Sequence, residues 1–363
     1  MSVKINGEHG VVCRLPNSPF GYFGWPSVAR MGDGTLAVAA SGPRNSHICP
    51  WGKDSIAYSR DDGRTWTAPV VAHDSPLDDR DAGLVSLGGQ SLLLTWFSLD
   101  PRQFFEHFNK HLAPDMIPWM EAKLSALTDA TIRANAGSWT RISLDGGKTW
   151  SAPRRSPVTA PHGPILLDGR TLLYAGKPFP EGDARPLSRD VAVARSDDLG
   201  ASWRVIGTVP HPAGFEADQV HEPHLVRLHD GTLLCALRVH EKDTLAVWMS
   251  RSADGGVSWS EPYRLPCDGT PPHLLMHSSG VVVCVYGYRH EPYGQRALVS
   301  RDGLTWSEEL ILRDDGLDGD LGYPASVELG DGSLFTVYYQ RLPGDDKTSV
   351  LYTRWRLPEL GRK

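Results

Sequence analysis

The sequence predicts an all-β fold, a six-bladed β-propeller with a short helical insertion in its second blade. Three observations lead to this prediction: a short motif that repeats along the chain, a second pattern in register with it, and a composition rich in turn-forming residues. Of the 363 residues, 37 are glycine and 28 are proline, and 12 tryptophans accompany 9 phenylalanines. Such a composition is typical of many turns and few long helices.

The short motif is Ser-x-Asp-x-Gly-x-Thr/Ser-Trp. Its full copies occupy residues 59–66, 143–150, 196–203 and 252–259, and a shortened copy occupies 300–306. Asp-Gly and Gly-Gly pairs between apolar runs favour tight turns, because these residues tolerate positive φ. We expect each copy to form a turn held by its Asp side chain, with the Trp packed beneath it.

The second pattern is an apolar run, a Gly/Asp turn and another apolar run. Its six copies begin near Pro26, Asp81, Pro164, Pro223, Pro272 and Pro324. Successive intervals are 55, 83, 59, 49 and 52 residues, and a unit of about 50 residues matches one four-stranded blade. Six such units predict one propeller domain over residues 1–363.

The long interval indicates an insertion over residues 101–137. Apolar residues recur there every three or four positions, which is typical of two short amphipathic helices. We expect this insertion to cover one end of the propeller, and it offers a surface through which the chain could form an oligomer.

Charge and cysteine content exclude several classes of function. The net charge of −6 argues against nucleic-acid binding, which needs a basic surface. The sequence has no long apolar run and its first residues lack the apolar core of a signal peptide, so we expect a cytoplasmic protein that does not bind membranes. The five cysteines form no CxxC pair, which argues against a disulfide framework and a zinc knuckle.

Candidate functional residues gather where the innermost strands begin and the second strands end, because these positions meet around the axis of a propeller. The first set is Trp25, Arg80, Asp81, His162, His221, Glu222, His224, His273 and Tyr323, and the second is Arg44, Lys177, Arg238, Arg289 and Gln340. An acidic chain thus concentrates cations and histidines in one ring. This ring is suited to a small anionic ligand.

The repeated motif resembles the Asp-box, or BNR repeat, of sialidases and their relatives, and the resemblance covers nearly the whole chain. It implies the six-bladed sialidase propeller but not an activity, because Asp-boxes also occur in propellers that do other work. Residues 222–238 are similar to the sialidase stretch with the catalytic glutamate and a carboxylate-binding arginine. Residues 322–340 are similar to the stretch with the nucleophilic tyrosine.

The resemblance implies that Tyr323 attacks the anomeric carbon while Glu222 draws its proton. Arg238 and Arg289 would then hold the anionic group of the substrate, with Arg296 as the substitute for Arg289. Free tyrosine has a pKa near 10, so it needs a base and nearby cations to act as a nucleophile.

The chain also departs from the sialidase pattern. The Arg-Ile-Pro segment of the first blade is replaced by Gly24-Trp25-Pro26, and a glutamate that supports that arginine is replaced by Gln340. The loop that would carry the acid/base aspartate offers His47, whose ordinary pKa near 6.5 suits proton transfer at neutral pH. A ring at Trp25 could stack on an apolar sugar face.

These observations predict a sialidase-like exo-glycosidase that acts on a terminal acidic sugar or on a sugar linked to an acidic sugar. Its expected partner is a small anionic oligosaccharide, and no cofactor is expected. The expected catalytic residues are Tyr323, Glu222, His47 and Asp81, and the expected substrate-binding residues are Arg238, Arg289, Arg44, Trp25, His162, His273, Lys177 and Gln340. Two alternatives stay open: a noncatalytic glycan-binding propeller, and a lyase that uses a metal held by the central histidines.

Overall fold

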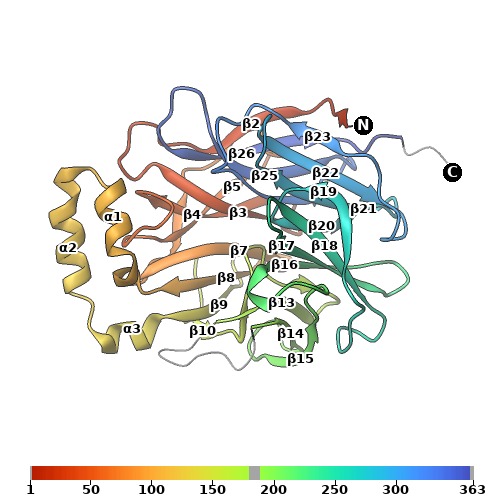
Figure 1. The fold of residues 1–363 in the computed structure, drawn as a ribbon, viewed down its shortest axis with the longest axis horizontal. Helices are drawn as coiled ribbons and strands as arrows, with labels where there is room; N and C mark the ends of the chain where they lie inside the picture. Colours follow the sequence, from red (N-terminus) through yellow and green to blue (C-terminus); the bar gives the residue numbers. More distant parts are fainter. Residues whose placement is uncertain (1, 180–188, 360–363) are drawn as a thin grey trace.

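The computed structural model of the protein describes residues 2–179 and 189–359. Its strands form six mainly antiparallel sheets, the blades of a β-propeller, and confirm the predicted fold class (Figure 1). Blade 1 contains β3 (Tyr22–Arg30), β4 (Leu36–Arg44), β5 (Asp54–Ser59) and β6 (Val70–His73). Blade 2 contains β7 (Asp78–Gly88), β8 (Ser91–Leu99), β9 (Gly137–Ser143) and β10 (Arg154–Arg155).

The next two blades follow the same order from the inside outward. Blade 3 contains β11 (Val158–Thr159), β12 (Ile165–Leu166), β13 (Leu172–Pro178), β14 (Val191–Ser196) and β15 (Arg204–Val209). Blade 4 contains β16 (Val220–Arg227), β17 (Leu233–His240), β18 (Leu245–Ser252) and β19 (Tyr263–Asp268).

The N-terminal strands complete the last two blades. Blade 5 contains β20 (Pro272–Met276), β21 (Val282–Tyr288), β22 (Gly294–Ser300), β23 (Leu310–Arg313) and the parallel edge strand β1 (Val3–Lys4). Blade 6 contains β24 (Gly322–Glu328), β25 (Leu334–Arg341), β26 (Thr348–Trp355) and β2 (Glu8–Cys13). Because β2 pairs with β26, the first residues of the chain close the ring against its last strands.

Apolar side chains pack between neighbouring blades. One cluster joins blades 1 and 6 through Phe23, Val28 and Phe335, and another joins blades 4 and 5 through Val247 and Leu298. Both faces of most blades are therefore buried, which explains the near-continuous apolar runs of β13, β17 and β21.

The repeated motif forms turns at the ends of outer strands. In the first copy, one carboxylate oxygen of Asp61 accepts a hydrogen bond from the Thr65 backbone amide, and the other accepts from the Thr65 hydroxyl. The Ser59 hydroxyl accepts from the Gly63 amide, and the Trp66 indole donates to the Gly63 carbonyl. The positive φ of Gly63, 87°, explains why glycine occupies this place in the turn.

The insertion lies outside the blades, at the edge of the ring beside blades 1 and 2 (Figure 1). It contains the 3₁₀ turns η1 (Pro101–Phe104) and η2 (Pro114–Met116), and the helices α1 (Phe105–His111), α2 (Ile117–Ser125) and α3 (Asp129–Asn135). Two helices were expected, and the third begins where the Thr128 hydroxyl accepts a hydrogen bond from the Thr131 amide. Among the described residues, no helix has the length and apolar character needed to cross a membrane.

The 3₁₀ turn η3 (Ala217–Gln219) follows β15 of blade 3 and leads into β16 of blade 4. The Glu216 and Gln219 side chains cap this turn reciprocally. The turn thereby fixes the entry of β16, which carries Glu222 toward the centre of the ring.

Candidate active site

Four blades share an unusual backbone feature where their innermost strands begin. Trp25, Asp81, Glu222 and Tyr323 have positive φ angles of 50°, 59°, 46° and 49°. At each of these places the pairing with the second strand shifts register. Left-handed backbone is costly for residues with a Cβ atom and is concentrated at functional sites. These shared bulges bring side chains from separate blades together.

Tyr323 and Glu222 meet across the centre of the ring. The Tyr323 hydroxyl donates to Glu222 Oε1 at 2.5 Å, and Arg238 Nη1 donates to Glu222 Oε2 at 2.6 Å. The same Arg238 nitrogen lies 3.2 Å from the Tyr323 hydroxyl oxygen. The structure thus brings together the three residues that the sialidase resemblance singled out in blades 4 and 6.

The electrostatics of this group give its members different protonation states. Burial, followed by the charge of Glu222, raises the pKa of Tyr323. Burial also opposes ionisation of Glu222, but Arg238 and the hydrogen bond from Tyr323 outweigh it and hold the pKa of Glu222 below its ordinary value. At neutral pH the pair therefore consists of a protonated phenol and an ionised carboxylate.

Asp81 is a buried carboxyl group whose pKa lies far above its ordinary value. Its side chain is buried, and burial raises its pKa to about 7 against the opposing charge of Arg80, with Glu222 adding to the rise. A carboxyl group that titrates near neutral pH can both give and accept a proton there.

His47 lies at the rim of the site, with 46% of its side chain exposed. Its Nδ1 is 3.2 Å from the Tyr22 hydroxyl and 3.6 Å from Asp320 Oδ1. Asp320 also accepts hydrogen bonds from the hydroxyls of Tyr22 and Tyr339. Desolvation lowers the pKa of His47 although Asp320 opposes the change, so the imidazole is neutral at pH 7.

Two functional candidates had no role assigned from the sequence. Asp320 precedes Tyr323 by three residues, and its nearness to the predicted nucleophile was the only signal that could have found it. Tyr339 is the residue of β25 opposite Gly322, so it lies beside Tyr323 with ring centroids 6.0 Å apart.

Arg289 remains a candidate for binding an anion. Its guanidinium carbon lies 5.7 Å from the centre of the Tyr323 ring, and its buried Nε has no hydrogen-bond partner among the described residues. Arg296, the substitute, is buried and donates to the backbone carbonyls of Pro292, Gln295 and Arg313. Both terminal nitrogens of Arg296 donate to the protein, and its Nε lies 3.6 Å from Glu309 Oε2, which leaves Arg289 as the better candidate.

Three central histidines pack against one another beneath Tyr323. Ring centroids of His162, His224 and His273 are 4.2 to 5.7 Å apart, and burial lowers the pKa of all three. The backbone amides of Leu274 and Ser326 donate to Nδ1 of His224 and His273. In the neutral imidazoles of His224 and His273 the proton is therefore on Nε2.

No group of three or more His, Cys, Asp or Glu side chains in the described part of the chain is arranged to hold a metal ion. His221 packs instead against His240, with 5.0 Å between ring centroids. The histidines of the ring therefore pack against one another in pairs and clusters of imidazole rings.

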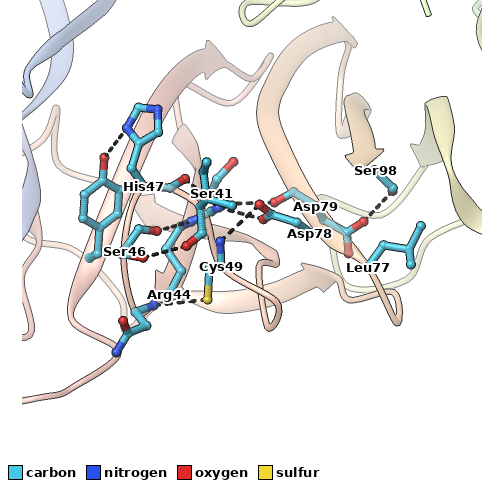
Figure 2. Close-up of polar contacts among 12 residues, drawn as sticks. Ser41, Arg44, Ser46, His47, Cys49, Leu77, Asp78, Asp79 and Ser98 are labelled. Atoms are coloured by element: carbon cyan, nitrogen blue, oxygen red, sulfur yellow. Dashed lines mark hydrogen bonds and ion pairs between the residues drawn. The ribbon is translucent and has the colours of Figure 1, made fainter. Parts of the chain in front are cut away.

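The structure differs from expectation at Arg44. Arg44 is fully buried in an ion pair of 2.7 Å with Asp78, which is also fully buried (Figure 2). Its remaining donors reach the carbonyls of Ser46, His47 and Asp79. Arg44 thus supports the loop that carries His47, and its fully buried side chain is not accessible to a substrate.

Trp25 also differs from expectation. Its side chain is fully buried, so it offers no exposed ring for stacking on a sugar. The guanidinium carbons of Arg44 and Arg80 lie 4.8 and 4.4 Å from its ring centre. Trp25 therefore packs against two charged side chains, Arg44 of its own blade and Arg80 of blade 2.

Lys177 and Gln340 are engaged with other parts of the protein. Lys177 donates to the backbone carbonyls of Arg189 and Ala217. Gln340 is buried and donates to Asp315 at 3.0 Å. Because successive side chains of a strand point to opposite faces, Tyr339 and not Gln340 lies on the side of β25 that contacts Tyr323.

Comparisons with known proteins agree with this architecture. The sequence profile of the BNR repeat-like domain family matches residues 114–336. None of the curated protein sequences matches the chain. A solved structure of a protein of unknown function from Dyadobacter fermentans has a TM-score of 0.74 and 21% sequence identity, and the match covers 97% of this chain and 98% of that chain.

Two further solved structures have named activities. The intramolecular trans-sialidase from Ruminococcus gnavus, in complex with oseltamivir carboxylate, has a TM-score of 0.66 and 14% identity, over 98% of both chains. The α-L-arabinanase from Penicillium chrysogenum, complexed with arabinobiose, has a TM-score of 0.62 and 15% identity, over 98% of this chain and 99% of that chain. At these identities the likeness establishes a shared fold.

Proposed function

Because this chain belongs to the BNR repeat-like domain family, we propose that its propeller is an exo-glycosidase. It hydrolyses the bond to a terminal acidic sugar or to a sugar that is linked to an acidic sugar. The observation that carries this proposal is the contact of Tyr323, Glu222 and Arg238, which places a phenol, a base and a cation within hydrogen-bond distance of one another.

In the first step, the Tyr323 oxygen attacks the anomeric carbon. The buried phenol resists ionisation by itself, so Glu222 takes its proton along the existing 2.5 Å hydrogen bond as the new bond forms. Arg238 holds Glu222 in place and offers positive charge to the tyrosine oxygen. Glycosidases more often use a pair of carboxylates, and tyrosine in this role is an established exception.

The oxygen of the leaving group needs a proton when the glycosidic bond breaks. Of the two candidates for this proton transfer, Asp81 and His47, Asp81 is the better one. With its pKa raised to about 7, Asp81 is substantially protonated at neutral pH, whereas His47 is neutral there and has no acidic proton of suitable strength. Ionised Asp81 then takes a proton from the water that hydrolyses the glycosyl-tyrosine bond, and Glu222 returns its proton to Tyr323.

The acidic character of the substrate is supported by the cations around the tyrosine. Arg289 lies over the Tyr323 ring with an unpartnered, buried Nε. A planar guanidinium matches the geometry of a carboxylate. Absence of the first-blade arginine favours a glycosidase related to sialidases over a sialidase itself.

A panel of chromogenic glycosides that includes sialosides, uronides, rhamnosides and arabinosides tests the proposal. We expect cleavage of at least one acidic member, and loss of at least a hundredfold in kcat for Tyr323→Phe. The matched control is Tyr338→Phe, which removes a hydroxyl from a buried tyrosine of the same blade that is hydrogen-bonded to Thr353 and Arg313. It should leave turnover intact.

Two results would contradict the proposal. Cleavage of no member, together with binding on a glycan array, would favour the noncatalytic glycan-binding propeller. Equal turnover by Tyr323→Phe and the unchanged protein would remove Tyr323 from the chemistry.

A further inference from the structure

From the geometry around Trp25 we infer that Arg80 is a further substrate-binding residue, which holds the carboxylate of the acidic sugar on the side of the site next to Asp81. This inference rests on the proposed function, because it names the residue that makes the same site selective for an acidic sugar. It also gives a role to Trp25, which replaces the first-blade arginine of the sialidase pattern: its ring positions Arg80.

The first observation is that the Arg80 guanidinium has no hydrogen-bond acceptor among the described residues. Among residues 2–179 and 189–359, none accepts a hydrogen bond from it, and its Nε is buried without a partner. Buried donors are nearly always satisfied, and an unsatisfied one costs about 1–3 kcal/mol or more when charged. The neighbouring Arg44, by contrast, donates to four protein oxygens.

The second observation is that aromatic rings hold this guanidinium in place. Its central carbon lies 4.4 Å from the Trp25 ring centre and 5.8 Å from that of Phe97. Phe97 is the residue directly opposite Arg80 in the pairing of β7 with β8. Cation–π contacts fix the charge without using its N–H donors, so these donors stay available to a ligand.

The third observation is the position of Arg80 relative to the reacting groups. It immediately precedes Asp81 in β7, and Trp25, on which it rests, lies 6.3 Å from the Tyr323 ring. Arg80 also influences the pKa of His47 and Asp81, lowering both. Its charge therefore acts on the same space as the proposed acid and nucleophile.

These observations favour a carboxylate as the ligand of Arg80. The guanidinium presents parallel N–H donors that pair with a carboxylate in a bidentate manner. Binding of an anion there would offset the influence of Arg80 on Asp81, so that a bound acidic sugar helps to keep Asp81 protonated for the first step. A neutral sugar would bring neither effect.

Calorimetric titration of the full chain with free sugars tests this inference without needing turnover. The probes are D-glucuronate and N-acetylneuraminate, with D-glucose and N-acetyl-D-glucosamine as neutral counterparts. We expect tighter binding of at least one acidic probe. Arg80→Met, which keeps an apolar stem over Trp25, should weaken that binding at least tenfold and leave the neutral probes unaffected, whereas Arg80→Lys should lose less.

The matched control is Arg155→Met. Arg155 also rests on a tryptophan, with its guanidinium carbon 3.9 Å from the Trp139 ring centre, but it lies on the outer edge of blade 2 and donates to backbone carbonyls. This variant should bind the acidic probes as the unchanged protein does. Melting temperatures of all variants identify any loss of folding.

Two outcomes would overturn the inference: equal affinity of the unchanged protein for acidic and neutral probes, or an acidic preference that survives Arg80→Met. Either can occur while glycosides are still cleaved, in which case the proposed function stands. Conversely, binding of acidic sugars that depends on Arg80, without cleavage of any glycoside, would sustain the inference and contradict the glycosidase.

Discussion

Replacement of Asp81 by asparagine should stabilise the protein while it abolishes turnover. The folded protein raises the pKa of this carboxyl from an ordinary 3.8 to about 7, so above pH 4 the folded state must either hold a proton or carry a buried charge. The stability that Asp81 contributes is fully present below pH 3.8 and is lost as pH rises through 7.

The magnitude follows from the shift. A difference of roughly three pKa units at about 1.36 kcal/mol each amounts to about 4 kcal/mol, which the neutral asparagine would regain at pH 8. The gain should shrink by about 1.4 kcal/mol for each pH unit below 7. Asp81 is buried, and no described residue donates a hydrogen bond to its carboxylate that asparagine would have to break.

Urea denaturation of both proteins at pH 5 and pH 8 measures the two free energies of unfolding, and kcat/KM is measured in parallel. If the proposed glycosidase activity is present, the unchanged protein should lose kcat/KM above about pH 7 as Asp81 ionises. The Asp81→Asn variant should lose most of its activity, and its remaining activity should no longer fall above pH 7. A stability gain that is equal at both pH values, or a destabilised variant at pH 8, would refute the assignment of a raised pKa to Asp81.

Three further predictions concern support of the site and the blades. Arg44→Met should lower the free energy of unfolding by about 3–5 kcal/mol, because it leaves Asp78 buried without its partner; recovery in a double variant with Asp78→Leu would identify the ion pair as the cause. Ser59→Ala should lower it by about 1–3 kcal/mol through loss of the Gly63 and Asp61 hydrogen bonds, and urea denaturation that detects no change would contradict the role of this turn. His47→Gln should reduce kcat less than Asp81→Asn does and leave the alkaline limb of the pH profile in place, because His47 is already neutral there; a profile that shifts with this variant would instead make His47 the titrating group.

Much of the architecture could be predicted because a repeat leaves a periodic record in the sequence. The six predicted strand starts lie in or beside β3, β7, β12, β16, β20 and β24, and the insertion lies within blade 2 as expected. The contact of Tyr323, Glu222 and Arg238 could also be predicted from the sequence, because equivalent positions of different blades must approach the common axis. Their catalytic roles stay predictions that the proposed experiments test.

The structure differs from the predicted ligand contacts at residues whose orientation or exposure depends on a one-residue shift in strand pairing or on a contact between blades. The sequence pattern points to Gln340, whereas the pairing of Gly322 with Tyr339 beside the bulge in β24 places Tyr339 against Tyr323. Trp25 and Arg44 looked like separate ligand contacts, but burial of each depends on what the adjoining blades place against it. Periodicity along one chain contains no information on such contacts.

The number of blades, the turns between their strands and the gathering of charged and aromatic residues at one set of positions follow from the amino-acid sequence alone, because each depends on local pattern and repetition. Which of these residues are available to a ligand depends on the tertiary structure. Arg44 and Arg80 both lie beside Trp25. Arg44 forms a buried ion pair with Asp78, whereas the N–H donors of Arg80 have no acceptor among the described residues. The physical reason is that hydrogen-bond satisfaction and desolvation depend on neighbours brought together from different blades.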